Sequence, residues 1–156
     1  MHFKKQIYSD PQELKQDISG ANNVVWTNGC FDLLHVGHVH SLKEASQYGD
    51  ILIVGLNSDE SVKQLKGVDR PIYSEQDRAS LLSSLGFVDA VLMFNGINPI
   101  EELKIIKPDI FAKGAEYDLS QIPEAQLVSK YGGKVVSISL IDSISTTDII
   151  NRIKSL

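Results

Sequence analysis

The chain has 156 residues, 42% hydrophobic and 22% charged, a composition typical of one ordinary globular domain. Fifteen basic and twenty acidic residues give a formal net charge of -5, which argues against a general nucleic-acid surface because such a surface needs clustered positive charge. A single cysteine excludes an intrachain disulfide, and no apolar run approaches the ~20 residues of a membrane-spanning helix. We therefore expect one cytoplasmic domain over residues 1–156, with no nucleic-acid or membrane partner.

The first element expected is a helix near the N-terminus. Asp10 can cap it, Pro11 suits its first turn, Glu13 completes a capping box and Gly20 can end it. Because this helix precedes the first predicted strand, we expect residues 1–20 to be a peripheral addition to the fold.

Strands and helices then alternate along the chain. Strands are predicted over residues 23–28, 50–56, 90–94, 109–113 and 134–140. The run over residues 50–56 is continuous in hydrophobicity, as expected for a strand covered on both faces. Helices are predicted over residues 36–48, 59–65, 74–85 and 122–131, from residue 98 onward, and after Ser145. The alternation predicts an α/β fold, a Rossmann-like doubly wound five-stranded parallel sheet in a single α/β/α domain. Ligands of such folds bind beyond the carboxyl ends of the strands, where the strand order reverses.

The strongest local signal follows the first predicted strand and reads Thr27-Asn28-Gly29-Cys30-Phe31-Asp32-Leu33-Leu34-His35-Val36-Gly37-His38. Two histidines three apart at a helix start project to one face. Gly37 lets an anion approach the backbone, and the helix N-terminus supplies unpaired N–H groups and partial positive charge. The pattern predicts a phosphate site; loop histidines without a function and metal ligands on a helix are the alternatives.

This segment resembles the signature of the cytidylyltransferase-like superfamily, G-x-F-D-x-x-H-x-G-H. Further matches lie along almost the whole chain: Asn57-Ser58-Asp59, Lys66-Gly67 with Arg70-Pro71, Glu75-Gln76-Asp77-Arg78, Lys113-Gly114 and Ile144-Ser145-Thr146-Thr147. Within the superfamily, the likeness is strongest to the adenylyltransferase domain that makes nucleotide-activated heptose from heptose 1-phosphate. The chain departs from the usual Lys-Gly-Gly-Asp-Tyr of those enzymes at Ala115 and Glu116, which leaves base and sugar preference open.

The resemblance implies catalytic roles for His35, His38 and Lys66. It implies nucleotide contact for Asn28, Gly29, Cys30, Phe31, Gly37, Lys113, Gly114, Ser145, Thr146 and Thr147. It implies contact with the second substrate or its phosphate for Asp32, Asn57, Arg70 and Arg78.

Structural roles compete with several of these assignments. Ser145 could simply cap a helix together with Asp148, and Lys66 could be a solvated surface lysine. An arginine on a helix, such as Arg78, is often structural. Asp32 could orient a backbone turn or a histidine more readily than it binds a metal. We expect no protein metal site.

The expected activity is transfer of an NMP unit from a nucleoside triphosphate to a sugar phosphate, with release of pyrophosphate. ATP and D-glycero-D-manno-heptose 1-phosphate are the first choice, and a CTP-using enzyme acting on glycerol 3-phosphate or another polyol or sugar phosphate is the alternative. Mg²⁺ would accompany the triphosphate, held by phosphate oxygens and water. The sequence lacks the sugar kinase domain of bifunctional relatives, so the acceptor would arrive phosphorylated. A homodimer, common among related enzymes, stays open.

Three other classes share part of this pattern. A dinucleotide-dependent oxidoreductase needs G-x-G-x-x-G after the first strand, and Asn28-Gly29-Cys30-Phe31 does not supply it. A fragment of a class I aminoacyl-tRNA synthetase would share His-x-Gly-His, but the chain is too short and too acidic for tRNA recognition. A non-catalytic nucleotide sensor would keep the same binding residues, so only a measurement of turnover separates it from an enzyme.

Overall fold

The computed structural model describes residues 3, 6–141 and 144–156. Its strands are β1 (Ile7–Tyr8), β2 (Val24–Gly29), β3 (Ile51–Asn57), β4 (Ala90–Phe94), β5 (Ile110–Gly114) and β6 (Lys134–Ile138). Its helices are α1 (Pro11–Asp17), α2 (Val36–Ser46), α3 (Asp59–Lys66), α4 (Glu75–Ser83), α5 (Ile100–Ile106), α6 (Pro123–Lys130) and α7 (Thr146–Lys154), with a 3₁₀ turn, η1 (Leu119–Gln121), before α6. None of the helices in this described part combines the length and hydrophobicity needed to cross a membrane.

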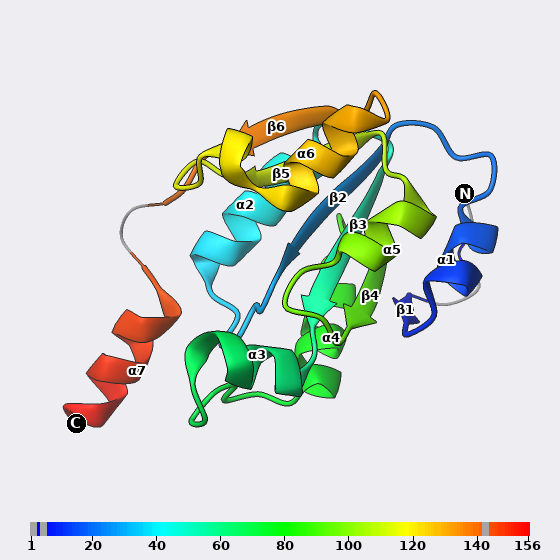
Figure 1. Ribbon diagram of the computed structural model, residues 1–156. Helices are drawn as coiled ribbons and strands as arrows, with labels where there is room; N and C mark the ends of the chain where they lie inside the picture. Colours follow the sequence, from blue (N-terminus) through cyan, green and yellow to red (C-terminus); the bar gives the residue numbers. More distant parts are fainter. Residues whose placement is uncertain (1–2, 4–5, 142–143) are drawn as a thin grey trace.

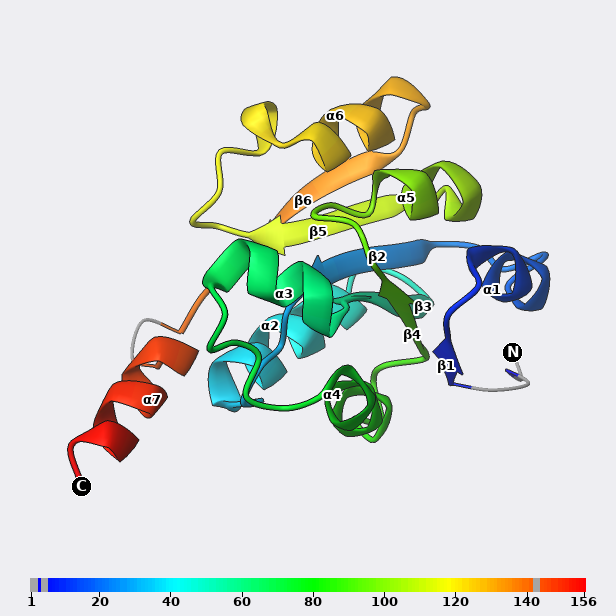
Figure 2. The same ribbon diagram turned by 60° about the horizontal axis from the view of Figure 1, so that its bottom comes forward.

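The strands form one parallel sheet in the order β1-β4-β3-β2-β5-β6. The chain runs outward from β2 through β3 to β4 and then returns to place β5 on the other side of β2. The strand order therefore reverses between β2 and β5, which confirms the prediction of a doubly wound parallel sheet. Figures 1 and 2 show α3 lying beyond the carboxyl ends of the central strands, near this reversal.

Each face of the sheet is covered by its own apolar core. Along β2, Val24 and Trp26 belong to the core under α1, α5 and α6, whereas Val25 belongs to the core under α2 and α4. This division follows from the alternation of side chains along a strand. Trp26 is completely buried, so both sides of the central strand are sealed and only its carboxyl end is available to a ligand.

The N-terminal segment differs from the prediction in two ways. Ile7 and Tyr8 form an additional edge strand, pairing in parallel with Val91 and Leu92 of β4, so the sheet has six strands in the described residues where five were predicted. Two residues are too short a run to show a strand period. The segment is also not peripheral, because Tyr8 and Leu14 are buried in the core with 1% and 0% exposure.

The C-terminal helix stands apart from these layers. Figure 1 shows α7 at the end of its own connection, away from both covered faces of the sheet, and α7 has no buried residue. Ser145 caps it through its side chain, as predicted. The start of α7 nevertheless lies against the loop after β2, because the Thr146 hydroxyl donates to the backbone oxygen of Asp32 at 2.8 Å.

Candidate active site

The structure brings His35 and His38 together at the start of α2. His35 is the N-cap residue, and its Nδ1 accepts the backbone N–H of Gly37 at 3.1 Å. Nδ1 of His38 accepts the backbone N–H of His35 at 3.4 Å. The imidazole rings stack with their centroids 3.7 Å apart and their planes 22° from parallel. Each histidine thus satisfies an N–H group that a helix start leaves without an intrahelical partner.

These hydrogen bonds decide what the two rings can do. Because each Nδ1 is an acceptor, a neutral ring carries its proton on Nε2 and can donate from there. Burial lowers the pKa of His35, and burial together with the charge of His35 lowers the pKa of His38 to about 4, against a small opposing effect of Asp32. At neutral pH both rings are therefore uncharged hydrogen-bond donors, suited to a phosphate on which negative charge develops.

Gly37 is required by packing as well as by access. A Cβ built on Gly37 would lie 2.9 Å from Cε1 of His35 and 3.4 Å from Cγ2 of Ile144. The first distance is shorter than real contacts allow, so any other residue would push the His35 ring out of the stack.

Asp32 orients the neighbouring loop. Its buried carboxylate accepts hydrogen bonds from Nε of Arg70 at 2.8 Å and from the backbone N–H groups of Ile72 and Tyr73 at 2.8 and 3.0 Å. Burial alone would raise the pKa of Asp32, but these hydrogen bonds outweigh it and hold the pKa below its ordinary value. Since the backbone oxygen of Asp32 also accepts from Thr146, one residue joins three parts of the site. The turn-orienting role is the one that these contacts support.

Arg78 has a structural role in this arrangement. Its side chain is fully buried, and its guanidinium donates to the backbone oxygens of Tyr73, Cys30 and Asn57 at 3.0, 2.8 and 2.7 Å. It also forms an ion pair with Asp59 at 2.7 Å. Since these four contacts face protein oxygens from three segments, at Cys30, at Asn57 with Asp59, and at Tyr73, we replace the phosphate contact predicted for Arg78 with a positioning role.

Asn57 is likewise engaged within the protein. Its side chain is buried at the end of β3 and donates from Nδ2 to Oγ of Ser61 at 2.8 Å. The Ser61 hydroxyl in turn donates to the backbone oxygen of Gly96 at 2.7 Å. This chain of hydrogen bonds anchors the first turn of α3, so Asn57 positions the helix that carries Lys66 at its end.

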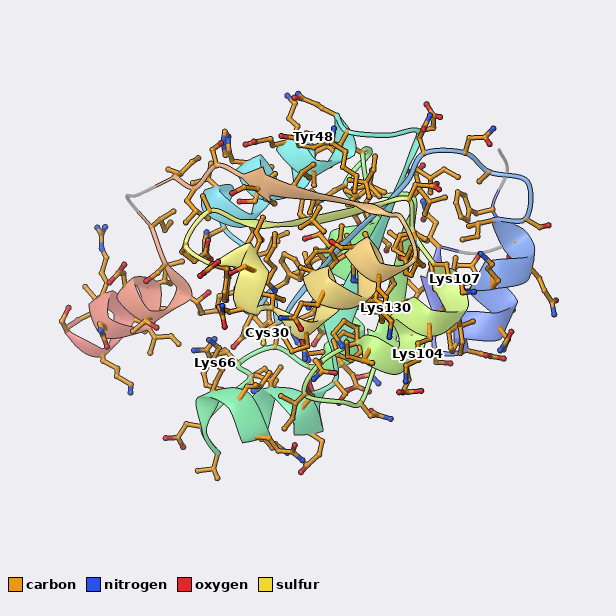
Figure 3. The ribbon with its side chains drawn as sticks, turned by 45° about the horizontal axis from the view of Figure 1, so that its top comes forward. Cys30, Tyr48, Lys66, Lys104, Lys107 and Lys130 are labelled. Atoms are coloured by element: carbon orange, nitrogen blue, oxygen red, sulfur yellow. The ribbon has the colours of Figure 1, made fainter. Side chains whose placement is uncertain are left out.

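Basic side chains surround Cys30. Burial raises the pKa of the Cys30 thiol, and the positive charges of Lys66, Arg78, Arg70 and Lys113 oppose that rise. Figure 3 shows Lys66, at the end of α3, close to Cys30. A thiol with a raised pKa is a poor nucleophile. The cluster instead concentrates positive charge at the sheet edge, in a protein whose net charge is -5.

Lys113 spans the point where the strand order reverses. It lies near the end of β5, and its Nζ donates to the backbone oxygen of Asn28 on β2 at 3.4 Å. The ammonium also lies 4.9 Å from the ring centroid of Tyr117. Burial lowers the pKa of Lys113, and the carboxylates of Glu124 and Glu116 oppose that effect. No pattern in the sequence points to Glu124, because an acidic residue in the first turn of a helix is ordinary.

At the start of α7, backbone N–H groups rather than side-chain hydroxyls are available to a phosphate. The Ser145 hydroxyl accepts from the backbone N–H of Asp148 at 3.1 Å and donates to the Asp148 carboxylate at 2.6 Å, so the predicted capping role accounts for it. The Thr146 hydroxyl is bonded to Asp32. The first-turn N–H groups of Thr146 and Thr147 have no intrahelical partner and remain suited to phosphate oxygens.

Two other features lie outside this constellation. Within the described ranges, no three His, Cys, Asp or Glu side chains are grouped so that they could hold a metal ion. A cavity of about 640 Å³ runs along α2, and none of the predicted site residues lines it; the lining residues are His40, Lys43, Glu44, Gln47 and Tyr48.

Comparison with known proteins then decides the family. Residues 26–152 match the model of the family described as Cytidylyltransferase-like. The chain belongs to the cytidylyltransferase-like family. It is accordingly a nucleotidyltransferase, and the family's histidine signature is the stacked pair described above.

Relatives of this family member come from several bacteria. The "Bifunctional protein HldE" of Syntrophotalea carbinolica is 50% identical over 130 residues, which cover 83% of this chain and 26% of the relative. The protein of the same name from Campylobacter fetus subsp. fetus is 46% identical over 152 residues, or 97% of this chain and 32% of the relative. The chain thus spans about a third or less of the length of these curated relatives.

Solved structures agree with the fold. The lipopolysaccharide core biosynthesis protein from Thermoplasma volcanium matches with a TM-score of 0.64 and 35% identity, covering 76% of this chain and 98% of that one. Pantothenate synthetase from Thermus thermophilus has a TM-score of 0.66 and 17% identity, covering 96% of this chain and 70% of that one. The second likeness is one of fold alone.

Proposed function

We propose that this nucleotidyltransferase joins AMP from Mg²⁺-bound ATP to D-glycero-D-manno-heptose 1-phosphate and releases pyrophosphate. The observation that carries the transfer chemistry is the stacked pair of neutral histidines, each with Nε2–H free of the backbone hydrogen bonds that fix Nδ1. The choice of ATP and heptose 1-phosphate is supported by the HldE relatives and the lipopolysaccharide protein, together with the sequence signature.

The reaction is an in-line displacement at the α-phosphorus. An oxygen of the sugar phosphate forms the new P–O bond, the bond to the β-phosphate breaks, and pyrophosphate leaves with the electron pair. The attacking oxygen is already ionised at neutral pH, so the protein needs no strong general base. Catalysis then consists of positioning and of stabilising negative charge.

The residues divide that work by their places in the site. His35 and His38 donate from Nε2 to the α-phosphate and the bridging oxygen, while Lys66 neutralises charge that develops on the leaving group. The N–H groups at the start of α7 bind the terminal phosphates. Mg²⁺ enters with the triphosphate as part of the substrate, and it adds charge neutralisation at the phosphate oxygens.

The polar groups on the neighbouring loop serve the acceptor. Arg70 is held at Nε by Asp32, which leaves the terminal nitrogens of its guanidinium to face a phosphate. Its side chain is 15% exposed, so the ion pair with Asp32 is largely shielded from solvent. This geometry favours Arg70 over Arg78 as the contact for the sugar phosphate.

Pyrophosphate release tests the proposal. The purified chain is incubated with Mg²⁺, each of the four NTPs in turn, and either heptose 1-phosphate or glycerol 3-phosphate. We expect release with ATP and heptose 1-phosphate. Release with CTP and glycerol 3-phosphate alone would replace the substrate pair with the second candidate, since the departure at Ala115 and Glu116 leaves base and sugar preference open. Nucleotide binding without release from any pair would make the chain a sensor and contradict catalysis.

A further inference from the structure

A buried carboxylate without a hydrogen bond lies beside Lys113. Glu124, the second residue of α6, is 8% exposed, and in the described part of the chain its side chain has no hydrogen bond or ion pair within 4 Å. Buried polar groups are normally hydrogen-bonded, so this one requires an explanation. The described residues contain no fully buried side-chain oxygen or nitrogen without a partner. The carboxylate of Glu124 is therefore not sealed in the core, and its oxygens open onto solvent.

The surroundings of Glu124 belong to the sheet edge where the site lies. Its charge acts on Lys113 and on Tyr117, as does the charge of Glu116. The Glu116 carboxylate folds back over Gly114, so closely that its Oε2 would collide with a Cβ placed on that glycine. Two carboxylates, an ammonium group and a half-exposed phenol ring thus line the carboxyl end of β5, beside the strand that carries the histidine signature.

The charges of the two carboxylates, Glu116 and Glu124, determine which kind of ligand can bind beside them. Two carboxylates repel a phosphate, so this group of side chains is not a second anion site beside the basic cluster at Cys30. An ionised carboxylate only accepts hydrogen bonds, and it therefore needs O–H or N–H donors. Adjacent sugar hydroxyls supply two such donors at the spacing of the two carboxylate oxygens, as in dinucleotide sites where an acidic residue holds a ribose.

We propose that Glu124 is a substrate-binding residue whose carboxylate accepts hydrogen bonds from the hydroxyl groups of a bound sugar. The inference rests on the proposed function, which brings two sugars to the site: the ribose of the nucleotide and the ring of the acceptor. Both present the same chemistry to the carboxylate. Lys113 and Tyr117 are the neighbouring groups on which the charge of Glu124 acts, and the Lys113 ammonium lies 4.9 Å from the ring centroid of Tyr117.

A purely structural role explains the position of Glu124 less well. An acidic side chain in the first turn stabilises a helix through the dipole, but a fully exposed side chain would do so equally well. If the role of Glu124 were to stabilise the positive charge of Lys113, an ion pair between the two side chains would be expected. No ion pair joins these two described side chains. Neither role requires a glutamate that is only 8% exposed while its carboxylate oxygens open onto solvent and, among the described residues, accept no hydrogen bond.

Kinetics of Glu124→Gln and Glu124→Ala test the inference, with Glu101→Gln on the exposed surface of α5 as the matched control. Each protein is assayed for pyrophosphate release with ATP, 2′-deoxyATP and 3′-deoxyATP, and the KM of the acceptor is determined. Loss of hydrogen bonds to a charged acceptor should raise the KM of one sugar-bearing substrate about 10-fold or more, with a small change in kcat. The control should match the wild type.

The two sources of the sugar give different patterns, and either one supports the inference. If Glu124 holds the ribose, the wild type prefers ATP to its deoxy analogues, and both variants lose that preference. If it holds the acceptor, the KM of the acceptor rises while the ratio of ATP to deoxyATP stays fixed. Unchanged KM values and ratios would overturn the inference. An equal rise in the KM of ATP and of its deoxy analogues, with the acceptor KM unchanged, would also overturn it, because a disturbed Lys113 would produce that pattern.

Calorimetry keeps the inference separable from the proposed function. Binding of ATP and 2′-deoxyATP, and of heptose 1-phosphate, is measured on the wild type and on Glu124→Gln, whose side chain has the same shape as glutamate. A wild type that binds these compounds but releases no pyrophosphate contradicts the proposed activity, while weaker binding by Glu124→Gln still supports the inference. Equal binding of all compounds by both proteins overturns it. Thermal unfolding verifies that the variants are folded.

Discussion

The imidazole of His35 lies over that of His38 with the ring centroids 3.7 Å apart, and both Nδ1 atoms accept backbone N–H groups. The same hydrogen bonds that complete the first turn of α2 thus fix the tautomer of both rings. The two Nε2–H groups are set in place by the helix before any substrate arrives, which is the condition for electrostatic preorganisation.

Removal of either ring should slow the chemical step. We expect His35→Ala and His38→Ala each to lower kcat by about 10²-fold, as loss of one oxyanion donor does. Glutamine can place an amide N–H near the position of Nε2, so His38→Gln should retain more activity than His38→Ala. Steady-state pyrophosphate release measures both effects. Near-normal turnover in either alanine variant would show that the pair does not act on the reacting phosphate.

The lowered pKa values of the histidines predict the pH profile. Because the pKa of His38 is about 4 and that of His35 is also lowered, the acidic decline of kcat should lie below the pH at which an ordinary histidine titrates. A loss of activity centred on 6.5, the ordinary histidine value, would contradict the neutral pair. The profile is measured at saturating substrate.

Stability should follow the same titration. The folded state binds fewer protons than the unfolded state between the folded pKa of His38 and the ordinary value of 6.5. The contribution of neutral His38 to the free energy of unfolding is therefore fully present above pH 6.5, and it should be lost as the pH falls toward 4. Urea unfolding of the wild type and of His38→Gln measures the effect, and the variant should show a shallower decline. Equal slopes would mean that His38 titrates alike in both states.

Replacement of Arg70 and of Arg78 by methionine should affect different properties of the protein. Arg78→Met leaves Asp59 and three backbone carbonyl oxygens without the guanidinium donor, which is itself fully buried, so we expect a loss of about 3–5 kcal/mol in unfolding free energy. Arg70→Met leaves Asp32 with two backbone donors and should chiefly raise the KM of the sugar phosphate. Urea unfolding and acceptor kinetics are compared, with exposed Arg152→Met as the control. A stable Arg78→Met with a raised acceptor KM would restore the phosphate role.

The hydroxyl of Thr146 should matter for nucleotide binding. Its hydrogen bond to the backbone oxygen of Asp32 holds the start of α7 at the site, and a net contribution of about 1 kcal/mol corresponds to roughly a fivefold change in affinity. We expect Thr146→Val to raise the KM of the nucleotide by that factor and Thr146→Ser to restore it. Equal values for the valine and serine variants would show that the contact does not position the helix.

Lys66 and Lys63 provide a matched pair on α3. Both side chains are exposed, but Lys66 acts electrostatically on Cys30 and Lys113, whereas Lys63, one turn earlier, is not among the charges of described residues that act on either of them. We expect Lys66→Ala to lower kcat by about 10²-fold through loss of charge stabilisation, and Lys63→Ala to leave it nearly unchanged. Equal losses in both variants, measured by pyrophosphate release, would reduce the role of Lys66 to general surface charge.

Local signals in the sequence were sufficient for most of the fold. The capping residues Asp10, Ser74 and Ser145 start their helices as predicted, and the five predicted strands became β2 to β6. The predicted sites gather at the carboxyl edge because parallel strands end there.

What could not be predicted depends on contacts between distant residues. The donors of Arg78 reach the backbone of Cys30, 48 residues away, and nothing near residue 78 indicates that partner. The edge strand at Ile7 is defined only by its pairing with β4. Glu124 resembles any acidic residue at a helix start, and only the structure shows that its carboxylate is buried and, among the described residues, without a hydrogen bond.

The contacts of Asp32 have a consequence for engineering the acceptor specificity. The loop that ends at Tyr73 is attached to the side-chain carboxylate of Asp32, and the backbone oxygen of the same residue holds the start of α7. A loop transplanted from a relative with a different acceptor would therefore have to present an arginine and two backbone N–H groups to Asp32. A graft that failed to do so would weaken nucleotide binding as well, although it altered no residue that touches the nucleotide.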